Sequence, residues 1–384
     1  MSGAVEDVGR RQGTLMVHLL GRCNLQCQHC YMHGSPTRRE RLPLHALIDA
    51  IEESEALGVG TLYLTGGEPL MYPRLAEVLA AADAIPGLEI TVCTNGTLLN
   101  ERHAELLRAS HAKANISIDG DEEFHDRFRA VKGALRRSER GIGMLVDAGT
   151  SVTIVSTISR GNLHMLEALA DWSATAGATR FRVQPLLHLG RAVELSDQHL
   201  TSAELNNLIL RLTDLRSRYD GKLDCGLIGV TRRYLNAHPC AAYVCNGQGC
   251  HRRMEKEIKK LVIREDGAIL PEVTNLSHAF ALGHLGDAPL TQLVARYFEA
   301  GYEHFDQLCR TTYADILPTW EAAVVPWDQI IADRSYTWRA PDRPSTTVPS
   351  TGCGARGCST ESTASRSARQ SAASDTETLT VLSA

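Results

Sequence analysis

The sequence predicts an α/β fold built on parallel strands. Short β-rich runs recur six times between residues 14 and 184, and stretches with helical periodicity separate them. Strands that alternate with helices form parallel βαβ units with right-handed crossovers. An open sheet and a closed or partial barrel both satisfy this pattern. In either case the ligand site should lie at the carboxyl ends of the strands.

Each expected element has a local signal. The expected strands are Thr14–Leu20, Thr61–Thr65, Glu89–Thr94, Ala114–Ile118, Ser151–Thr157 and Ala178–Gln184. Apolar residues at helical spacing form one stripe at Leu44, Leu47, Ile48 and Ile51, and another at Leu163, Leu166, Leu169 and Ala170. We expect Asn162 to cap the second of these helices.

The alternation of strands and helices ends near residue 200. Together with the change in composition at the two ends, this predicts four parts of the chain. These are an N-terminal arm (1–13), the α/β core (14–200), a small α+β C-terminal module (201–340) and a disordered tail (341–384) rich in Ser, Thr and Ala. In the module we expect helices over 202–218 and 289–300 and a hairpin around Asp266-Gly267. Trp320, Trp327 and Trp338 follow, in a segment expected to cap the core.

Composition narrows the classes of function. The net charge of -5 gives no general attraction to nucleic acid or to anionic membranes, so neither is an expected partner. The first residues lack a secretory signal, and no apolar run is long enough to span a bilayer. We therefore expect a cytoplasmic protein, in which the 11 cysteines are metal ligands, catalytic groups or core residues rather than disulfides.

Three cysteines stand together directly after the first expected strand, at Cys23, Cys27 and Cys30. Their thiolates can converge on one iron–sulfur cluster if the backbone folds into a loop around it. A cubane cluster normally takes four thiolates, so three leave one iron open to a small molecule. The alternative is a structural zinc site with His29 or His33 as its fourth ligand. The strand, loop and helix order favours the cluster.

These residues resemble the radical S-adenosylmethionine superfamily. The cysteine triplet, with His29 before its third cysteine, is similar to the superfamily's signature. Four later segments resemble its GGE, TNG, SxDG and HDxxR elements: Gly66-Gly67-Glu68, Thr94-Asn95-Gly96, Ser117-Ile118-Asp119-Gly120 and His125–Arg129. The resemblance implies a partial (β/α)6 barrel, followed by a small α+β C-terminal module and a disordered tail.

The resemblance also implies roles for individual residues. Gly66, Gly67 and Glu68 would hold the amino group of the methionine moiety, since glycines admit close backbone approach and a carboxylate adds a charge-assisted bond. Thr94 and Asn95 would line the cofactor pocket, Ser117 and Asp119 would approach the ribose and carboxylate region, and Arg129 would meet the methionine carboxylate. Thr157, Asn162 and Gln184 would touch adenosine.

The C-terminal module resembles a degenerate SPASM or Twitch module, which holds auxiliary four-iron clusters. Gly190-Arg191 resembles the linker to such modules, but Glu272 stands where the cysteine that follows the hairpin is expected. Candidate ligands for one auxiliary cluster are Cys240, Cys245, Cys250 and Cys309, with Glu272 as an unusual alternative. We expect Cys93 to lie in the core, and we expect Cys353 and Cys358 in the tail not to bind a cluster.

The implied activity is reductive cleavage of S-adenosylmethionine to a 5'-deoxyadenosyl radical, which abstracts hydrogen from a substrate. The implied cofactors are a 4Fe–4S cluster and S-adenosylmethionine, and a ferredoxin or flavodoxin would donate the electron. The substrate is a peptide or a small molecule, in natural-product or peptide maturation. Sugar- or nucleoside-directed dehydrogenation, epimerisation or decarboxylation is the alternative. A non-catalytic iron–sulfur or zinc protein is the alternative from another class.

Overall fold

A computed structural model describes residue 11, residues 13–244 and residues 258–339 of the chain. The arm and tail predicted at the two ends fall almost entirely outside these residues. Within them, no helix is both long and apolar enough to cross a membrane.

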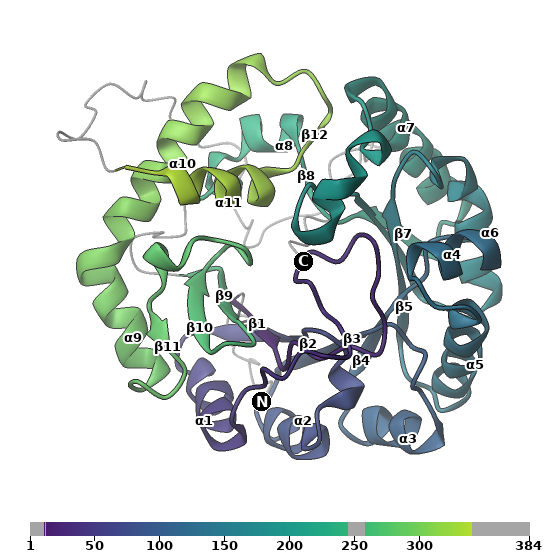
Figure 1. Ribbon diagram of the computed structural model, residues 1–384, viewed down its shortest axis with the longest axis horizontal. Helices are drawn as coiled ribbons and strands as arrows, with labels where there is room; N and C mark the ends of the chain where they lie inside the picture. The colour runs from purple at the N-terminus through teal and green to yellow at the C-terminus, as the bar shows by residue number, and fades with distance from the viewer. Residues whose placement is uncertain (1–10, 12, 245–257, 340–384) are drawn as a thin grey trace, which may run out of the picture.

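The six predicted strands are present and parallel. They are β1 (Gly13–His18), β2 (Val59–Thr65), β3 (Glu89–Thr94), β4 (Lys113–Ser117), β5 (Val152–Ile158) and β6 (Arg180–Pro185), each hydrogen-bonded to the next. Between them run the helices α1 (Leu44–Ser54), α2 (Leu75–Asp83), α3 (Glu101–Ala109), α4 (Glu122–Phe128), α5 (Ala134–Asp147) and α6 (Leu166–Thr175). Figure 1 shows these helices as an outer layer around the strands.

Side chains alternate along each strand, and the alternation separates a core from a cavity. In β2, Leu62 and Leu64 are fully buried and belong to the main apolar core. Thr61, Tyr63 and Thr65 point the other way and line a cavity. Because successive side chains of a strand face opposite sides, one face of the sheet packs on the helices and the other surrounds the cavity.

Strands from the C-terminal part extend the same sheet at both edges. The helix α7 (Ser202–Arg218) leads to β7 (Asp224–Leu227), which pairs with β6. At the other edge lie β9 (Lys260–Ile263), β10 (Ala268–Pro271) and β11 (Gly283–His284), with β9 parallel to β1. The predicted hairpin is therefore present, and it continues the sheet of the core. The resulting sheet has 10 strands, in the order β11-β10-β9-β1-β2-β3-β4-β5-β6-β7.

Further elements contribute to a second apolar core beside the hairpin. They are β8 (Val230–Thr231), α8 (Arg232–Ala237), α10 (Tyr302–Ile316), β12 (Val324–Val325) and α11 (Trp327–Thr337). The buried residues of α9 (Leu290–Arg296) belong to the main core instead. Phe305, Leu308 and Trp327 are buried together in the second core. In Figure 1 these elements lie beside the opening that the strands surround. Trp320 and Trp327 line the cavity, which places the predicted capping segment against it.

Candidate active site

Cys23, Cys27 and Cys30 lie in the loop between β1 and α1 and line the cavity, whose volume is about 1070 Å³. Each sulfur receives N–H groups from the surrounding protein. The amide of Leu25 lies 3.4 Å from the Cys23 Sγ, and the amide of Gly34 lies 3.3 Å from the Cys30 Sγ. Hydrogen bonds to sulfur stabilise thiolates and tune iron–sulfur clusters. This loop therefore suits three metal-bound thiolates.

Side chains from distant elements complete this set of donors. The Arg129 Nη1 lies 3.9 Å from the Cys27 Sγ, and the Asn95 Nδ2 lies 3.9 Å from the Cys23 Sγ. Burial, assisted by the nearby Glu68 carboxylate, raises the pKa of Cys23 to about 12. Burial also raises the pKa of Cys27, although Arg129 opposes that shift. The metal-free thiols of Cys23 and Cys27 are therefore protonated at neutral pH, and binding of a metal would release their protons.

The geometry favours a cluster over a single zinc ion. His29, one candidate zinc ligand, is stacked on Phe128 with the ring centroids 4.0 Å apart. Among the described residues, no three His, Cys, Asp or Glu side chains are grouped closely enough to hold one metal ion. A zinc ion needs its ligands within about 2.3 Å of one point, whereas a cubane meets each thiolate at a different iron.

The Gly-Gly-Glu segment after β2 packs against the start of the cysteine loop. The amide of Gly67 donates to the Leu20 carbonyl at 2.7 Å, and the amide of Glu68 donates to the Arg22 carbonyl at 2.9 Å. A Cβ at Gly67 would lie 2.1 Å from the Arg22 oxygen, so only glycine fits this approach. Gly66 and Gly67 line the cavity beside the cysteines.

Glu68 has a different surrounding from the one the motif implies. Its side chain is fully buried, outside the residues that line the cavity. One carboxylate oxygen accepts from the Thr94 hydroxyl at 2.6 Å and the Leu70 amide at 3.1 Å, and the other accepts from the Asn95 amide at 2.9 Å. Glu68 thus joins the end of β2 to the end of β3, and in this way positions Thr94 and Asn95, which do line the cavity.

Asp119 and Arg129 form a buried ion pair between β4 and the cysteine loop. The Arg129 Nε donates to the Asp119 Oδ2 at 2.7 Å, and both side chains are less than one-tenth exposed. Burial opposes ionisation of Asp119, but Arg129, His29 and His125 outweigh it and hold its pKa at about 2. The pair fixes the guanidinium beside Cys27. Arg129 lines the cavity, whereas Asp119 lies behind it.

The weaker adenosine candidates divide in the same way. Ser117, Thr157 and Gln184 line the cavity. Asn162 is fully buried and stands at the predicted N-cap position, but its side chain makes no capping hydrogen bond. Its amide instead donates to the Asp119 carbonyl at 2.6 Å and the Thr157 carbonyl at 2.9 Å. The position was therefore predicted correctly, whereas the side chain joins two strand ends.

Sequence reasoning missed the contact that the segment after β6 makes with the cysteine loop. The Arg191 Nε donates to the Cys27 carbonyl at 2.7 Å, and its backbone amide donates to the Cys30 carbonyl at 3.0 Å. A Cβ at Gly190 would lie 2.4 Å from the Cys30 oxygen. The Gly190-Arg191 pair was recognised in the sequence as a linker motif, but only the folded structure shows that it holds the cysteine loop.

The candidate auxiliary ligands lie in very different surroundings. Cys309 is fully buried in the second apolar core, and burial raises its pKa well above the usual value. The Glu272 oxygens accept from the Lys259 amide at 2.7 Å and the Lys260 amide at 3.1 Å. Cys240 is half-buried, and Cys245 and Cys250 lie outside the described residues. These observations do not assemble an auxiliary site.

Two further cysteines occupy opposite faces of the sheet. Cys225 is 1% exposed and belongs to the main core. Cys93 was expected in the core, but it lines the cavity, where the Asn115 Nδ2 lies 3.8 Å from its sulfur. That expectation is wrong because Cys93 stands at an inward position of β3.

Comparison with known proteins identifies the family. The model of the "Radical SAM superfamily" matches residues 17–172. A probable GTP 3',8-cyclase of Methanothermobacter thermautotrophicus is 31% identical over 244 residues, which cover 61% of this chain and 80% of that protein. The chain belongs to the radical SAM superfamily. It is an enzyme, and the cofactors of this superfamily are a 4Fe–4S cluster and S-adenosylmethionine.

Other relatives of the chain carry names that state different activities. An AdoMet-dependent heme synthase of Nitratidesulfovibrio vulgaris is 36% identical over 200 residues, 50% of this chain and 53% of that protein. The chain therefore spans about half the length of the heme synthases it matches. Streptococcus suis SuiB, solved with S-adenosylmethionine, has a TM-score of 0.63 at 18% identity over 78% of this chain and 68% of SuiB. This likeness shows a shared fold.

Proposed function

We propose that this radical SAM enzyme cleaves S-adenosylmethionine reductively and abstracts hydrogen from a substrate held in the cavity. The observation that carries the proposal is the gathering of Cys23, Cys27 and Cys30 on one wall of that cavity, each with an N–H donor to its sulfur. When bound there, the 4Fe–4S cluster would supply the electron that splits the sulfonium.

The chain's own residues would then bind and orient the cofactor. Gly66 and Gly67 present backbone next to the cysteine loop, where an ammonium group can approach closely. Arg129, held by Asp119, offers a fixed cation beside Cys27 for a carboxylate. Ser117, Thr157 and Gln184 supply polar groups at the ends of β4, β5 and β6. In this proposal the polar parts of S-adenosylmethionine contact different residues of the cavity wall.

The size of the cavity supports a second occupant. Small-molecule sites usually measure roughly 300–1,000 Å³, and this cavity, at about 1070 Å³, is as large as the upper end of that range. We therefore propose that it holds both S-adenosylmethionine and an organic substrate. Its walls include C-terminal residues such as Tyr243, Lys260 and Trp327, so the second half of the chain would contact the substrate.

For the substrate we propose a peptide, in natural-product or peptide maturation. SuiB, which shares the fold, has been solved with its precursor peptide SuiA. The alternative is a nucleoside-type substrate, which the similarity to the probable GTP 3',8-cyclase favours because this chain spans most of that protein. The proposed electron donor is a ferredoxin or flavodoxin.

The test is anaerobic reconstitution of the full chain with iron and sulfide, followed by an assay for 5'-deoxyadenosine with S-adenosylmethionine and dithionite. We expect 5'-deoxyadenosine from the wild type and none from a variant with Cys23, Cys27 and Cys30 changed to Ala. Cys93→Ala is the matched control, since Cys93 lines the same cavity outside the motif. A fully loaded wild type that forms no 5'-deoxyadenosine would refute the proposal.

A further inference from the structure

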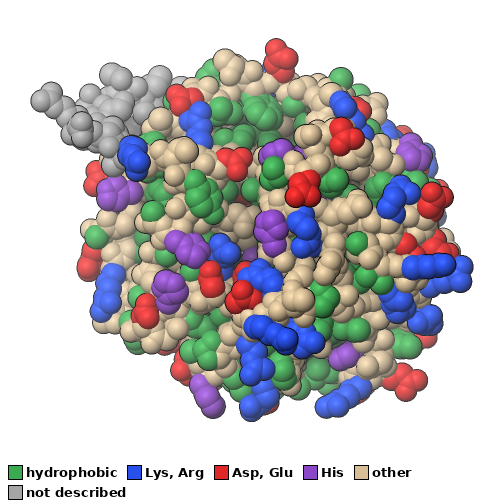
Figure 2. All heavy atoms as spheres, viewed as in Figure 1, with side chains coloured by type: hydrophobic (Ala, Val, Ile, Leu, Met, Phe, Trp, Pro, Cys, Tyr) green, Lys and Arg blue, Asp and Glu red, His purple; other side chains and the backbone are tan. Residues whose placement is uncertain are grey.

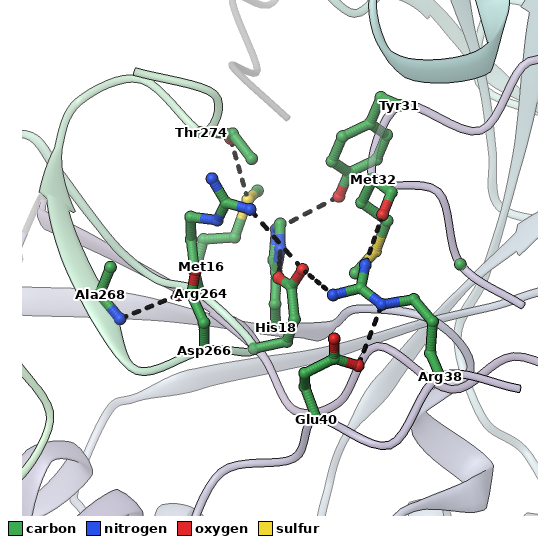
Figure 3. Close-up of polar contacts among 12 residues, drawn as sticks. Met16, His18, Tyr31, Met32, Arg38, Glu40, Arg264, Asp266, Ala268 and Thr274 are labelled. Atoms are coloured by element: carbon green, nitrogen blue, oxygen red, sulfur yellow. Dashed lines mark hydrogen bonds and ion pairs between the residues drawn. The ribbon is translucent and has the colours of Figure 1, made fainter. Parts of the chain in front are cut away.

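A buried polar network joins the C-terminal hairpin to the cysteine loop. His18, the last residue of β1, is 1% exposed and lies between two partners. Its Nδ1 lies 3.3 Å from the Glu265 Oε2, and its Nε2 lies 3.2 Å from the hydroxyl of Tyr31, the residue after Cys30. Figure 3 shows the Tyr31 hydroxyl pointing at His18 and Arg38 reaching the same network from the side of Glu40.

Glu265 lies at the centre of this network. It belongs to the turn between β9 and β10, and its side chain is 1% exposed. Its Oε1 accepts from the Arg38 Nη2 at 3.0 Å, and Arg264 lies 3.7 Å away. Burial opposes its ionisation, but the hydrogen bond and the charge of His18 outweigh burial and hold its pKa at about 2. An ionised carboxylate only accepts hydrogen bonds, so the His18 Nδ1 carries the proton between them.

Arg38 carries the contact onward into the loop. Its Nη1 donates to the Met32 carbonyl at 2.7 Å, and its Nε donates to Glu40 at 3.1 Å. Between Met32 and Arg38 lies Gly34, whose amide donates to the Cys30 sulfur. Tyr31 and Met32, the two residues that follow Cys30, are thus each tied to Glu265 through one intermediate side chain.

We propose that Glu265 is a positioning residue for the cofactor loop: through His18 it fixes Tyr31, and through Arg38 it fixes the backbone beside Cys30. This inference rests on the proposed function, since it assigns Glu265 to the geometry of that same site. It makes the hairpin of the C-terminal module a structural part of the S-adenosylmethionine pocket. The loop itself contains no strand or helix from residue 21 to residue 43, so it depends on such contacts for its shape.

The physical reason lies in the burial of the carboxylate. Removing one member of a buried charged network leaves its partners without compensation, which costs far more than the loss of an exposed pair. In Glu265→Gln, the neutral amide no longer balances the charge of Arg38, and its N–H group can face His18 only if the ring carries its proton on Nε2 and donates it to Tyr31. Either arrangement changes a contact of Tyr31 or of the Met32 carbonyl, the two residues after Cys30.

Glu265→Gln should be compared with Glu40→Gln, a matched control. Glu40 also accepts from Arg38, but it is 46% exposed and has no contact with His18. The reconstituted full-length variants would be measured for iron content, for the EPR spectrum of the reduced protein with and without S-adenosylmethionine, and for the Kd of S-adenosylmethionine by equilibrium dialysis. We expect Glu265→Gln to keep its iron, weaken binding by about tenfold and alter the spectrum. Glu40→Gln should match the wild type.

Arg38→Met provides a second variant, because the Arg38 side chain is 22% exposed and its loss is easier to tolerate. It should weaken S-adenosylmethionine binding in the same direction, and it decides the question if Glu265→Gln does not fold. A wild-type Kd and spectrum in folded Glu265→Gln and Arg38→Met would overturn the inference. Failure of the wild type itself to form 5'-deoxyadenosine would instead count against the proposed function.

Discussion

Two buried carboxylates have opposite electrostatic surroundings: Asp119, beside the cysteine loop, and Glu272, which follows the C-terminal hairpin near Cys309. Beside the loop, Arg129 and neighbouring histidines overcome the burial of Asp119 and hold its pKa at about 2. Near the hairpin, burial dominates over Lys259 and Lys260 and raises the pKa of Glu272 to about 7. The surroundings of Asp119 thus favour a buried charge, whereas those of Glu272 penalise one.

The cysteine sulfur atoms of the two regions also differ in their surroundings: those of the loop are near N–H donors, whereas that of Cys309 is among apolar side chains. Around the loop, backbone and side-chain N–H groups point at all three sulfurs, and all three cysteines line the cavity. At the hairpin, Cys309 packs among apolar side chains, and Glu272 is bound by backbone amides. A site that binds a charged group needs preorganised donors of this kind. The comparison teaches that the donors around the cysteines distinguish the two regions.

The charged side chains on the outer surface do not separate the two regions. Figure 2 shows basic and acidic side chains interspersed over the face that it draws. The contrast is therefore internal, and variants of buried residues are the way to test it.

The largest expected effect is on the loop itself. Cys27→Ala removes the thiol that faces Arg129 and should abolish 5'-deoxyadenosine formation, because a cubane held by two thiolates loses an anchoring ligand. Product is measured by chromatography and mass spectrometry. Cys225→Ala, in the apolar core, is the control and should retain activity. Normal turnover in Cys27→Ala would mean that the cysteine loop does not hold the catalytic cluster.

The next largest effect should come from Asp119→Asn. It leaves the buried Arg129 cation uncompensated and should lower the free energy of unfolding by about 3–5 kcal/mol, measured in urea. Because the pKa of Asp119 is held at about 2, below its usual value of 3.8, this stabilisation is present above pH ~4 and is lost as the pH falls through about 2. Equal stability of variant and wild type at pH 7 would contradict the account.

A smaller effect of opposite pH dependence is expected at Glu272. Its pKa is raised from 4.5 to about 7, so ionisation in the folded state costs free energy that the unfolded chain avoids. The stabilisation from the neutral form is complete below pH ~4.5 and is lost as the pH rises through about 7, by an amount on the order of 3 kcal/mol. Glu272→Gln should flatten this part of the stability curve. Parallel curves for the two proteins would show that Glu272 is not the group responsible.

The smallest effect is expected at Cys309. Cys309→Ala should leave the iron content of the reconstituted protein unchanged and should cost about 1–2 kcal/mol of stability, as a small loss of core packing does. Iron is measured by colorimetric assay, and stability by thermal unfolding. A drop in iron per chain would mean that Cys309 is a cluster ligand and that the hairpin region resembles the loop after all.

Local patterns predicted the elements of the core closely. The second strand was expected at Thr61–Thr65 and runs from Val59 to Thr65, and the helix over 202–218 begins and ends as predicted. Period and turn signals are properties of adjacent residues, so a sequence shows them directly. The pairing of β9 with β1 joins residues far apart in the chain, and no local pattern specifies it.

The site shows the same limit. The motifs placed polar residues at the strand ends, but they could not tell a side chain that faces the cavity from one that joins neighbouring strands. Glu68 and Asn162 are of the second kind. Glu265 lies in an ordinary turn sequence. Its contact with His18 could not be predicted, because the two residues are 247 positions apart in the chain. Only the fold shows that the hairpin reaches the cysteine loop.

The central claim is that Cys23, Cys27 and Cys30 hold a cluster with one iron open to S-adenosylmethionine. The most direct measurement is the EPR spectrum of the reconstituted, dithionite-reduced protein before and after addition of S-adenosylmethionine, together with its metal content. The account predicts an iron–sulfur signal that changes on addition and is lost when the three cysteines are replaced by Ala. Zinc bound at the loop, or a signal indifferent to S-adenosylmethionine, would contradict it.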